Sequence, residues 1–317
     1  MTNHSPTNLA STSAGRPADG VGNVTTGIIQ ISAGMLIVPI LDVFAKLLGN
    51  DLDPVEVTFM RFIMQALLMA PFVIYFRLWT IPRGTLLLQS ARGVLLAIAT
   101  VCFFTALQHM PIAEAISIYF AQPMILTILS ALLLGETIRA RRIIAIIIGL
   151  IGTCVILQPS IMVFGLPAIY PLGSSISMAF YIALTRRLAH EVNPFQMQFM
   201  VGVVAMLVLG FALLIGNQLG LPGTRIIMPT MQHIWWVIGM GLAATIGHGF
   251  IVLAAAHAPA NVLAPFQYLE IIGATLFGYM VFGDVPAPST VVGVIIIISS
   301  GLYLFHRERQ LKADTAH

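Results

Sequence analysis

Long apolar stretches separated by short polar linkers dominate the sequence and restrict what it can fold into. A bilayer core about 30 Å thick is spanned by a helix of about 20 apolar residues, and windows of this kind occur ten times along the chain. Hydrophobic residues make up 58% of the chain and charged residues only 9%, whereas charged residues form about a quarter of a soluble domain. We therefore expect an all-α membrane protein and exclude a soluble fold.

The spans and their flanking charges predict a topology. The ten expected spans run near residues 26–48, 57–76, 86–108, 111–134, 143–157, 166–185, 195–215, 233–256, 259–282 and 288–305. With the N-terminus inside, most Lys and Arg residues fall in cytoplasmic segments, and Lys46 and Arg225 lie outside. The positive-inside rule then places both termini in the cytoplasm of a bacterial cell, with the chain in the inner membrane. Residues 1–25 are expected to form a disordered cytoplasmic tail, and residues 306–317 a second cytoplasmic tail.

An internal repeat is visible in the sequence. Residues 48–60 match residues 188–200 at a constant shift of 140, and residues 109–136 match residues 257–284 at a shift of 148. Each half holds an odd number of expected helices, so the charge-derived topology turns the second half upside down relative to the first. Inverted repeats are the architecture from which many secondary transporters are built.

The expected architecture is therefore ten transmembrane helices arranged as two inverted five-helix repeats, residues 26–158 and 166–305. Two small-residue runs on expected helices predict close helix contacts. These runs are Gly241, Thr245 and Gly249, and Ala145, Gly149 and Thr153.

Several motifs resemble the EamA family of the drug/metabolite transporter superfamily. They are the segment from Ala106 through Leu-Gln-His-Met-Pro to Ala115, the pair Gln122 and Pro123, and Leu-Leu-Gly-Glu-Thr at Leu133 to Thr137. The resemblance implies a ten-helix metabolite carrier, with family members that export amino acids or their derivatives and others that take up nucleoside-like or vitamin-like compounds. The chain most resembles the bacterial riboflavin-uptake members, which makes riboflavin uptake the expected function and export of amino acids or related metabolites the alternative.

Polar side chains at membrane depth are costly and are therefore functional candidates. Glu270 lies near the middle of the ninth expected span and corresponds to Gln122 in the fourth, while Gln267 corresponds to Tyr119. Within each helix the two residues are spaced i, i+3, Tyr119 with Gln122 and Gln267 with Glu270, which places both on one helix face. The residues that directly follow Tyr119 and Gln267, which are Phe120 and Tyr268, are both aromatic. Together with Arg92, the predicted substrate-binding residues are Tyr119, Phe120, Gln122, Gln267, Tyr268 and Glu270.

Proline interrupts the same two expected helices, at Pro123 and at Pro265. A proline ring removes one helical hydrogen bond and frees the carbonyl four residues earlier. Broken helices at corresponding places in two repeats indicate a transporter's binding site. The alternative is that these Gln and Tyr side chains only hydrogen-bond neighbouring helices.

The remaining charges inside the spans have local interpretations. Arg92 is expected to pair with Glu270 or with an anionic substrate group, or else to extend to the membrane interface, whereas Arg61 is expected to extend to the interface. Asp42 and Lys46 share a helix face at i, i+4 and predict a local ion pair.

The sequence lacks the motifs of nucleotide-driven transport and of common hydrolases and metalloenzymes. It contains no P-loop, and its only lysines are Lys46 and Lys312, so we expect secondary or facilitated transport, with Glu270 as a hypothetical proton carrier. We expect no catalytic residues, metal or cofactor, although a membrane-embedded enzyme with a divergent site stays open as a distant alternative. We do not expect a channel, because a channel would show rings of like charge and no such pattern appears in the sequence. The expected partners are a small-molecule substrate and the lipid bilayer but no nucleic acid, and the oligomeric state is open, a homodimer included.

Overall fold

The chain is helical throughout the residues that a computed structural model describes, which are 19–82, 84–134, 140–188, 191–258 and 260–314. No strand occurs within these ranges, which confirms the all-α class. In chain order the elements are α1 (Asp19–Leu48), α2 (Pro54–Tyr75), α3 (Leu86–Leu107), α4 (Ile112–Tyr119), α5 (Gln122–Leu134), α6 (Ala140–Phe164), the 3₁₀ turn η1 (Leu166–Ile169), α7 (Tyr170–Leu188), α8 (Pro194–Gln218), α9 (Met231–His257), α10 (Ala260–Leu263), the 3₁₀ turn η2 (Ala264–Tyr268), α11 (Leu269–Phe282) and α12 (Pro288–Asp314).

Most of the expected spans are present as long apolar segments. Among the described residues, 8 segments are long and apolar enough to cross a membrane, including α4 continued into α5 and η1 continued into α7. The expected ninth span is divided among α10, η2 and α11, and the apolar part of α12, Pro288–Tyr303, is shorter than the others. The count of ten spans stays a prediction.

Three boundaries differ from the sequence-based expectation. Helix α1 begins at Asp19, so residues 19–25 are helical and do not belong to a disordered tail, while residues 1–18 lie outside the described part. The fifth expected span, residues 143–157, is longer in the structure, because α6 continues through Pro159 to Phe164; proline is tolerated inside membrane helices. Helix α12 extends to Asp314. Residues 135–139, which carry most of the Leu-Leu-Gly-Glu-Thr motif, are not described.

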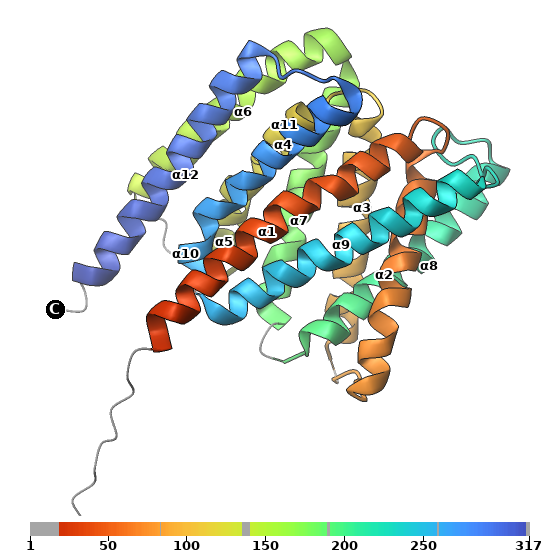
Figure 1. Cartoon of the computed structure of the whole chain (residues 1–317), viewed down its shortest axis with the longest axis horizontal. Coiled ribbons are helices and arrows are strands. Elements are labelled where there is room, and N and C mark those ends of the chain that lie inside the picture. Colours follow the sequence, from red (N-terminus) through yellow and green to blue (C-terminus); the bar gives the residue numbers. More distant parts are fainter. Residues whose placement is uncertain (1–18, 83, 135–139, 189–190, 259, 315–317) are drawn as a thin grey trace, which may run out of the picture.

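The helices pack in pairs that join distant parts of the sequence. Helix α1 lies along α9, α3 along α7, α2 along α8, and α6 along α12. Figure 1 shows the described beginning of α1 and the described end of α12 at the same end of the bundle. Each half of the chain is therefore packed mainly against the other half.

Glycines allow two of these pairs to approach closely. A Cβ atom on Gly34 of α1 would lie 2.9 Å from the carbonyl oxygen of Gly247 in α9, and one on Gly293 of α12 would lie 2.7 Å from that of Gly152 in α6. The predicted small-residue runs are confirmed in part, because a Cβ on Gly241 would lie 2.8 Å from the Met64 side chain of α2 and one on Gly149 would meet the Met124 side chain of α5. Gly249 has no atom within 4 Å of the position that its Cβ would take.

Polar contacts tie loops to helices at both ends of the bundle. At one end, the Glu56 carboxylate accepts hydrogen bonds from the backbone N–H of Ile227, at 3.2 and 3.3 Å. At the other end, the Gln196 side-chain amide donates to the carbonyl oxygens of Leu78, at 3.0 Å, and Thr80, at 2.8 Å. Glu56 and Gln196 are related by the shift of 140.

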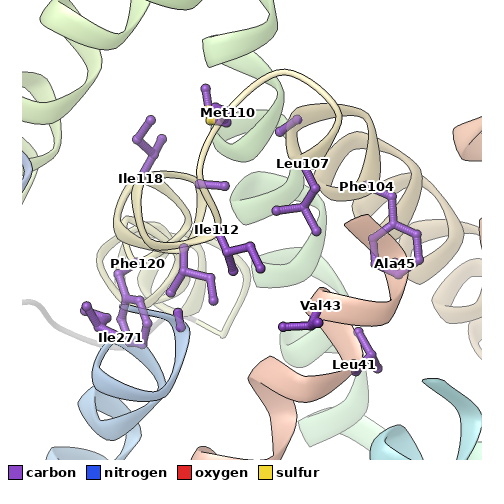
Figure 2. Packing of buried hydrophobic residues seen from close by; sticks show 14 of the residues in the cluster. Leu41, Val43, Ala45, Phe104, Leu107, Met110, Ile112, Ile118, Phe120 and Ile271 are labelled. Atoms are coloured by element: carbon purple, nitrogen blue, oxygen red, sulfur yellow. The ribbon is translucent and has the colours of Figure 1, made fainter. Parts of the chain in front are cut away.

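The largest hydrophobic cluster lies where the two halves meet. Figure 2 shows Phe120 beside Ile271 of α11, with Ile112 and Ile118 of α4 close by and Leu41 on the adjoining stretch of α1. All five side chains are buried. Close packing of these side chains holds α1, α4 and α11 in fixed positions around the polar groups described next.

Candidate functional site

The two helices predicted to be broken are broken in the structure. Helix α4 ends at Tyr119 and α5 begins at Gln122, just before Pro123, while Pro265 lies in the turn η2 that precedes α11. The breaks bring residues from both halves together, because the Phe120 ring lies 5.4 Å from the Tyr268 ring. Tyr119 makes edge-to-face contacts with Phe103, at 5.6 Å, and with Phe120, at 6.3 Å.

Two carboxylates lie beside this aromatic group. Glu270, in the first turn of α11, is half-buried, and Asp42 of α1 is 4% exposed. The two carboxylates are close enough for their charges to interact, and both also interact electrostatically with the Tyr119 hydroxyl. Gly273 lets α11 approach α1, since a Cβ there would lie 3.0 Å from the Pro39 ring. The structure therefore places an acidic pair next to aromatic rings.

The expectation that Arg61 extends to the membrane interface is wrong. Arg61 is 7% exposed, and its charge interacts with Asp42 and with Tyr181 of α7. Its guanidinium donates a hydrogen bond to the Thr100 hydroxyl, at 3.4 Å, and lies 4.6 Å from the Phe62 ring centre. The ring of His248 on α9 is also within electrostatic range of Arg61. Arg61 is therefore buried inside the bundle and does not extend to an interface.

The predicted ion pair between Asp42 and Lys46 is also wrong. Lys46 instead forms an ion pair with Asp284, at 2.6 Å, and its Nζ atom lies 4.6 Å from the Phe282 ring centre. The i, i+4 spacing permits an ion pair between Asp42 and Lys46. In the structure, however, Asp42 faces the interior of the bundle, whereas Asp284, just after the end of α11, lies next to Lys46. Lys46 thus ties α1 to the turn before α12.

Arg92 is buried between α3 and α7 and does not extend to the interface. It is 1% exposed, and its Nε atom donates to the Thr185 hydroxyl, at 2.8 Å. A terminal nitrogen donates to the Tyr181 hydroxyl, at 3.3 Å, and the guanidinium lies 5.0 Å from the Tyr181 ring centre. These contacts go to α7, whereas the expected partner Glu270 lies on α11.

The two predicted glutamines have different surroundings. Gln122, the first residue of α5, is 9% exposed, whereas Gln267 in η2 is exposed. The i, i+3 pairs therefore do not present equivalent surfaces in the two halves. The structure brings Tyr119, Phe120, Tyr268 and Glu270 together and leaves Gln267 at the edge of this group.

Three functional candidates were missed by the sequence analysis. Asp42 and Arg61 were assigned to the ends of their helices, and Tyr181 was not singled out. The sequence contained a signal for Asp42 and Arg61, which is the cost of a charge in an apolar span. The sequence analysis instead explained Asp42 by an ion pair with Lys46 and Arg61 by extension to the membrane interface. Tyr181 carries no comparable signal, because tyrosines also occur as membrane anchors.

The described residues provide no metal site, since no group of three or more His, Cys, Asp or Glu side chains is placed to hold an ion. The chemistry available at the site is therefore that of two carboxylates, two guanidiniums and a set of aromatic rings. This set can bind a ligand with charges of both signs and a flat ring system.

Comparisons with known proteins identify a family of membrane transporters. The profile of the EamA-like transporter family matches residues 25–158 and again residues 165–305. An S-adenosylmethionine uptake transporter of Rickettsia prowazekii is 26% identical over 292 residues, covering 92% of this chain and 96% of the relative. A riboflavin transporter of Vibrio cholerae is 31% identical over 195 residues, or 61% of this chain and 62% of the relative. A solved crystal structure with 16% identity and a TM-score of 0.62 covers 90% of this chain and 99% of its own, which shows the fold alone.

Proposed function

Because the chain belongs to the EamA-like transporter family, we propose that this small-molecule membrane transporter is a secondary carrier that takes up S-adenosylmethionine. The observation that carries this proposal is the acidic pair of Asp42 and Glu270 beside the Tyr119 hydroxyl. S-adenosylmethionine carries a sulfonium and an ammonium group, and two carboxylates in a partly buried site attract such cations more strongly than they would in bulk water. A relative with that activity aligns over almost the whole chain.

Aromatic rings complete the proposed binding region. The Phe120 and Tyr268 rings, one from each half, lie 5.4 Å apart at an angle of 31°. Aromatic faces attract cations and stack on flat heterocycles. In the proposed complex, the adenine ring packs against these side chains while the sulfonium faces the carboxylates. Gln122, Gln267 and Arg92 complete the set of proposed substrate contacts.

The proposed mechanism is alternating access between two inverted repeats of five spans, residues 26–158 and 166–305. The family profile matches the chain twice, at nearly these positions. The packing is reciprocal, since α1 lies along α9 and α3 along α7, so the first span of each half pairs with the third span of the other. Glu56 and Gln196, at matching positions, hold loops at opposite ends. We place the carrier in a bacterial inner membrane with both termini cytoplasmic.

Uptake of radiolabelled S-adenosylmethionine into cells that express the chain tests the proposal. We expect saturable uptake above an empty-vector control, and a drop of about tenfold or more in Asp42→Asn and in Glu270→Ala, because each variant removes one charge from the site. If Glu270→Gln retained uptake, Glu270 would not be a proton carrier. Absence of uptake above the empty-vector control, in cells whose membrane contains the wild-type chain, would contradict the substrate assignment.

Riboflavin uptake is the second candidate, and the Vibrio cholerae relative favours it. A flat isoalloxazine ring suits the Phe120 and Tyr268 pair, but riboflavin has no positive charge for Asp42 and Glu270 to bind. Labelled riboflavin in the same cells separates the two candidates. Riboflavin uptake that persists in Asp42→Asn, without any uptake of S-adenosylmethionine, would favour riboflavin.

A further inference from the structure

Arg92 is a buried cation whose contacts within the described part of the chain are with neutral groups. Its hydrogen bonds go to the hydroxyls of Thr185 and Tyr181, and it lies against the Tyr181 ring. Its second terminal nitrogen, NH1, is buried and has no hydrogen-bond partner among the described residues. Arg92 forms no ion pair in this part of the chain, although it is 1% exposed.

Arg61 provides the comparison within the same molecule. It is nearly as buried as Arg92, but its charge interacts with that of Asp42. A buried guanidinium without a counter-charge is strongly destabilising, and the cost is higher still in an apolar membrane segment. Arg92 therefore requires an anion that the described residues do not supply.

The position of Arg92 identifies where that anion comes from. The Tyr181 hydroxyl, which accepts from Arg92, in turn donates to the side-chain oxygen of Gln198, at 3.3 Å. Tyr181 also interacts electrostatically with Arg61 and with Tyr119. Tyr181 thus joins Arg92, by a hydrogen bond, to groups within electrostatic range of the aromatic and acidic region, where the substrate is proposed to bind.

We propose that Arg92, held in place by Tyr181 and Thr185, binds the carboxylate group of the transported substrate. This inference rests on the proposed function and assigns the opposite end of the substrate from the one that Asp42 and Glu270 bind. A guanidinium with a free N–H group forms short, charge-assisted hydrogen bonds to a carboxylate. The site would then select α-amino acid derivatives over amines of similar shape.

Competition between two probes tests the assignment. Membrane vesicles that contain the chain and no internal substrate are given labelled S-adenosylmethionine together with either unlabelled S-adenosylmethionine or its decarboxylated analogue. The uptake of label at each competitor concentration is measured. We expect the wild type to bind the carboxylated compound at least tenfold more tightly than the analogue. In Arg92→Gln this preference should fall below about threefold, through weaker binding of the carboxylated compound alone.

The matched control is Gln89→Leu. Gln89 lies one turn before Arg92 on α3, is 0% exposed, and donates only to Thr85, at 3.1 Å. The control should keep the full tenfold preference. If Arg92→Gln fails to reach the membrane, Arg92→Lys replaces it, and we expect a smaller but measurable loss of preference, because lysine lacks the planar fork that binds carboxylates.

The outcomes separate this inference from the proposed function. If the wild type takes up S-adenosylmethionine but does not distinguish the two probes, the inference is wrong and the proposed function stands. If the wild type takes up no S-adenosylmethionine, both fail. If replacement of chloride by gluconate abolishes uptake while Arg92→Gln keeps the tenfold preference, the anion at Arg92 is chloride, and the carboxylate assignment is overturned.

Discussion

Single charged side chains in this protein are held by partners on other helices. The charge of Arg61 on α2 interacts with that of Asp42 on α1, and the charge of Asp42 in turn interacts with that of Glu270 on α11. Without Arg61, two carboxylates would remain close together with no cation to compensate them. The acidic pair that we assign to the substrate thus depends on Arg61 for its stability in the absence of substrate.

Replacement of Arg61 by methionine should therefore destabilise the protein strongly. Removal of one partner of a buried pair costs about 3–5 kcal/mol, which lowers Tm by about 5 °C or more for a chain of this size. The double variant Arg61→Met with Asp42→Asn should recover part of this loss, since it removes the unpaired carboxylate. Thermal unfolding of the detergent-solubilised protein measures both. Equal Tm values for the single and double variants would show that Asp42 is not the partner that matters.

At the scale of the elements, the fold depends on close contact between helices from different halves. Gly152 and Gly293 bring α6 and α12 together, and the Ser300 hydroxyl on α12 donates to the Ala145 carbonyl oxygen of α6, at 2.5 Å. In a membrane, such packing and hydrogen bonds replace the hydrophobic effect as the force between helices.

Replacement of Gly293 by valine should separate α6 from α12. Its Cβ would lie 2.7 Å from the Gly152 carbonyl oxygen, and overpacking of this kind costs about 1–3 kcal/mol. We expect a lower yield of monodisperse protein and a lower Tm. Gly249→Ala is the control, because its Cβ meets no atom within 4 Å, and it should match the wild type. Wild-type behaviour of Gly293→Val would mean that the two helices are not in contact.

At the scale of the whole molecule, the proposed topology fixes which loops face which side. The loop between α8 and α9 should be external and the loop between α2 and α3 cytoplasmic, and each offers a well-exposed residue, Met228 at 89% and Trp79 at 61%. After Cys102 and Cys154 are replaced by alanine, an impermeant maleimide should label Met228→Cys in intact cells. Trp79→Cys should be labelled only after permeabilisation. Labelling of both in intact cells would contradict the proposed inverted arrangement.

The sequence by itself determined the class of fold and the positions of the two broken helices. Ten apolar windows predicted a helical membrane chain, and Pro123 and Pro265 predicted where two helices are interrupted, because these features are local. The sequence also indicated Glu270 as a candidate site residue, since a charge in the middle of an apolar span is costly wherever the helix packs.

Only the tertiary structure decided which charges face one another. Helices that are apolar on all sides give little indication of which face is buried, so i, i+4 spacing suggested Lys46 as the partner of Asp42. The structure instead pairs Lys46 with Asp284, 238 residues away, and turns Asp42 toward Arg61 and Glu270. Rotation of each helix about its axis is set by contacts with helices from the other half, and no pattern within a single segment encodes those contacts.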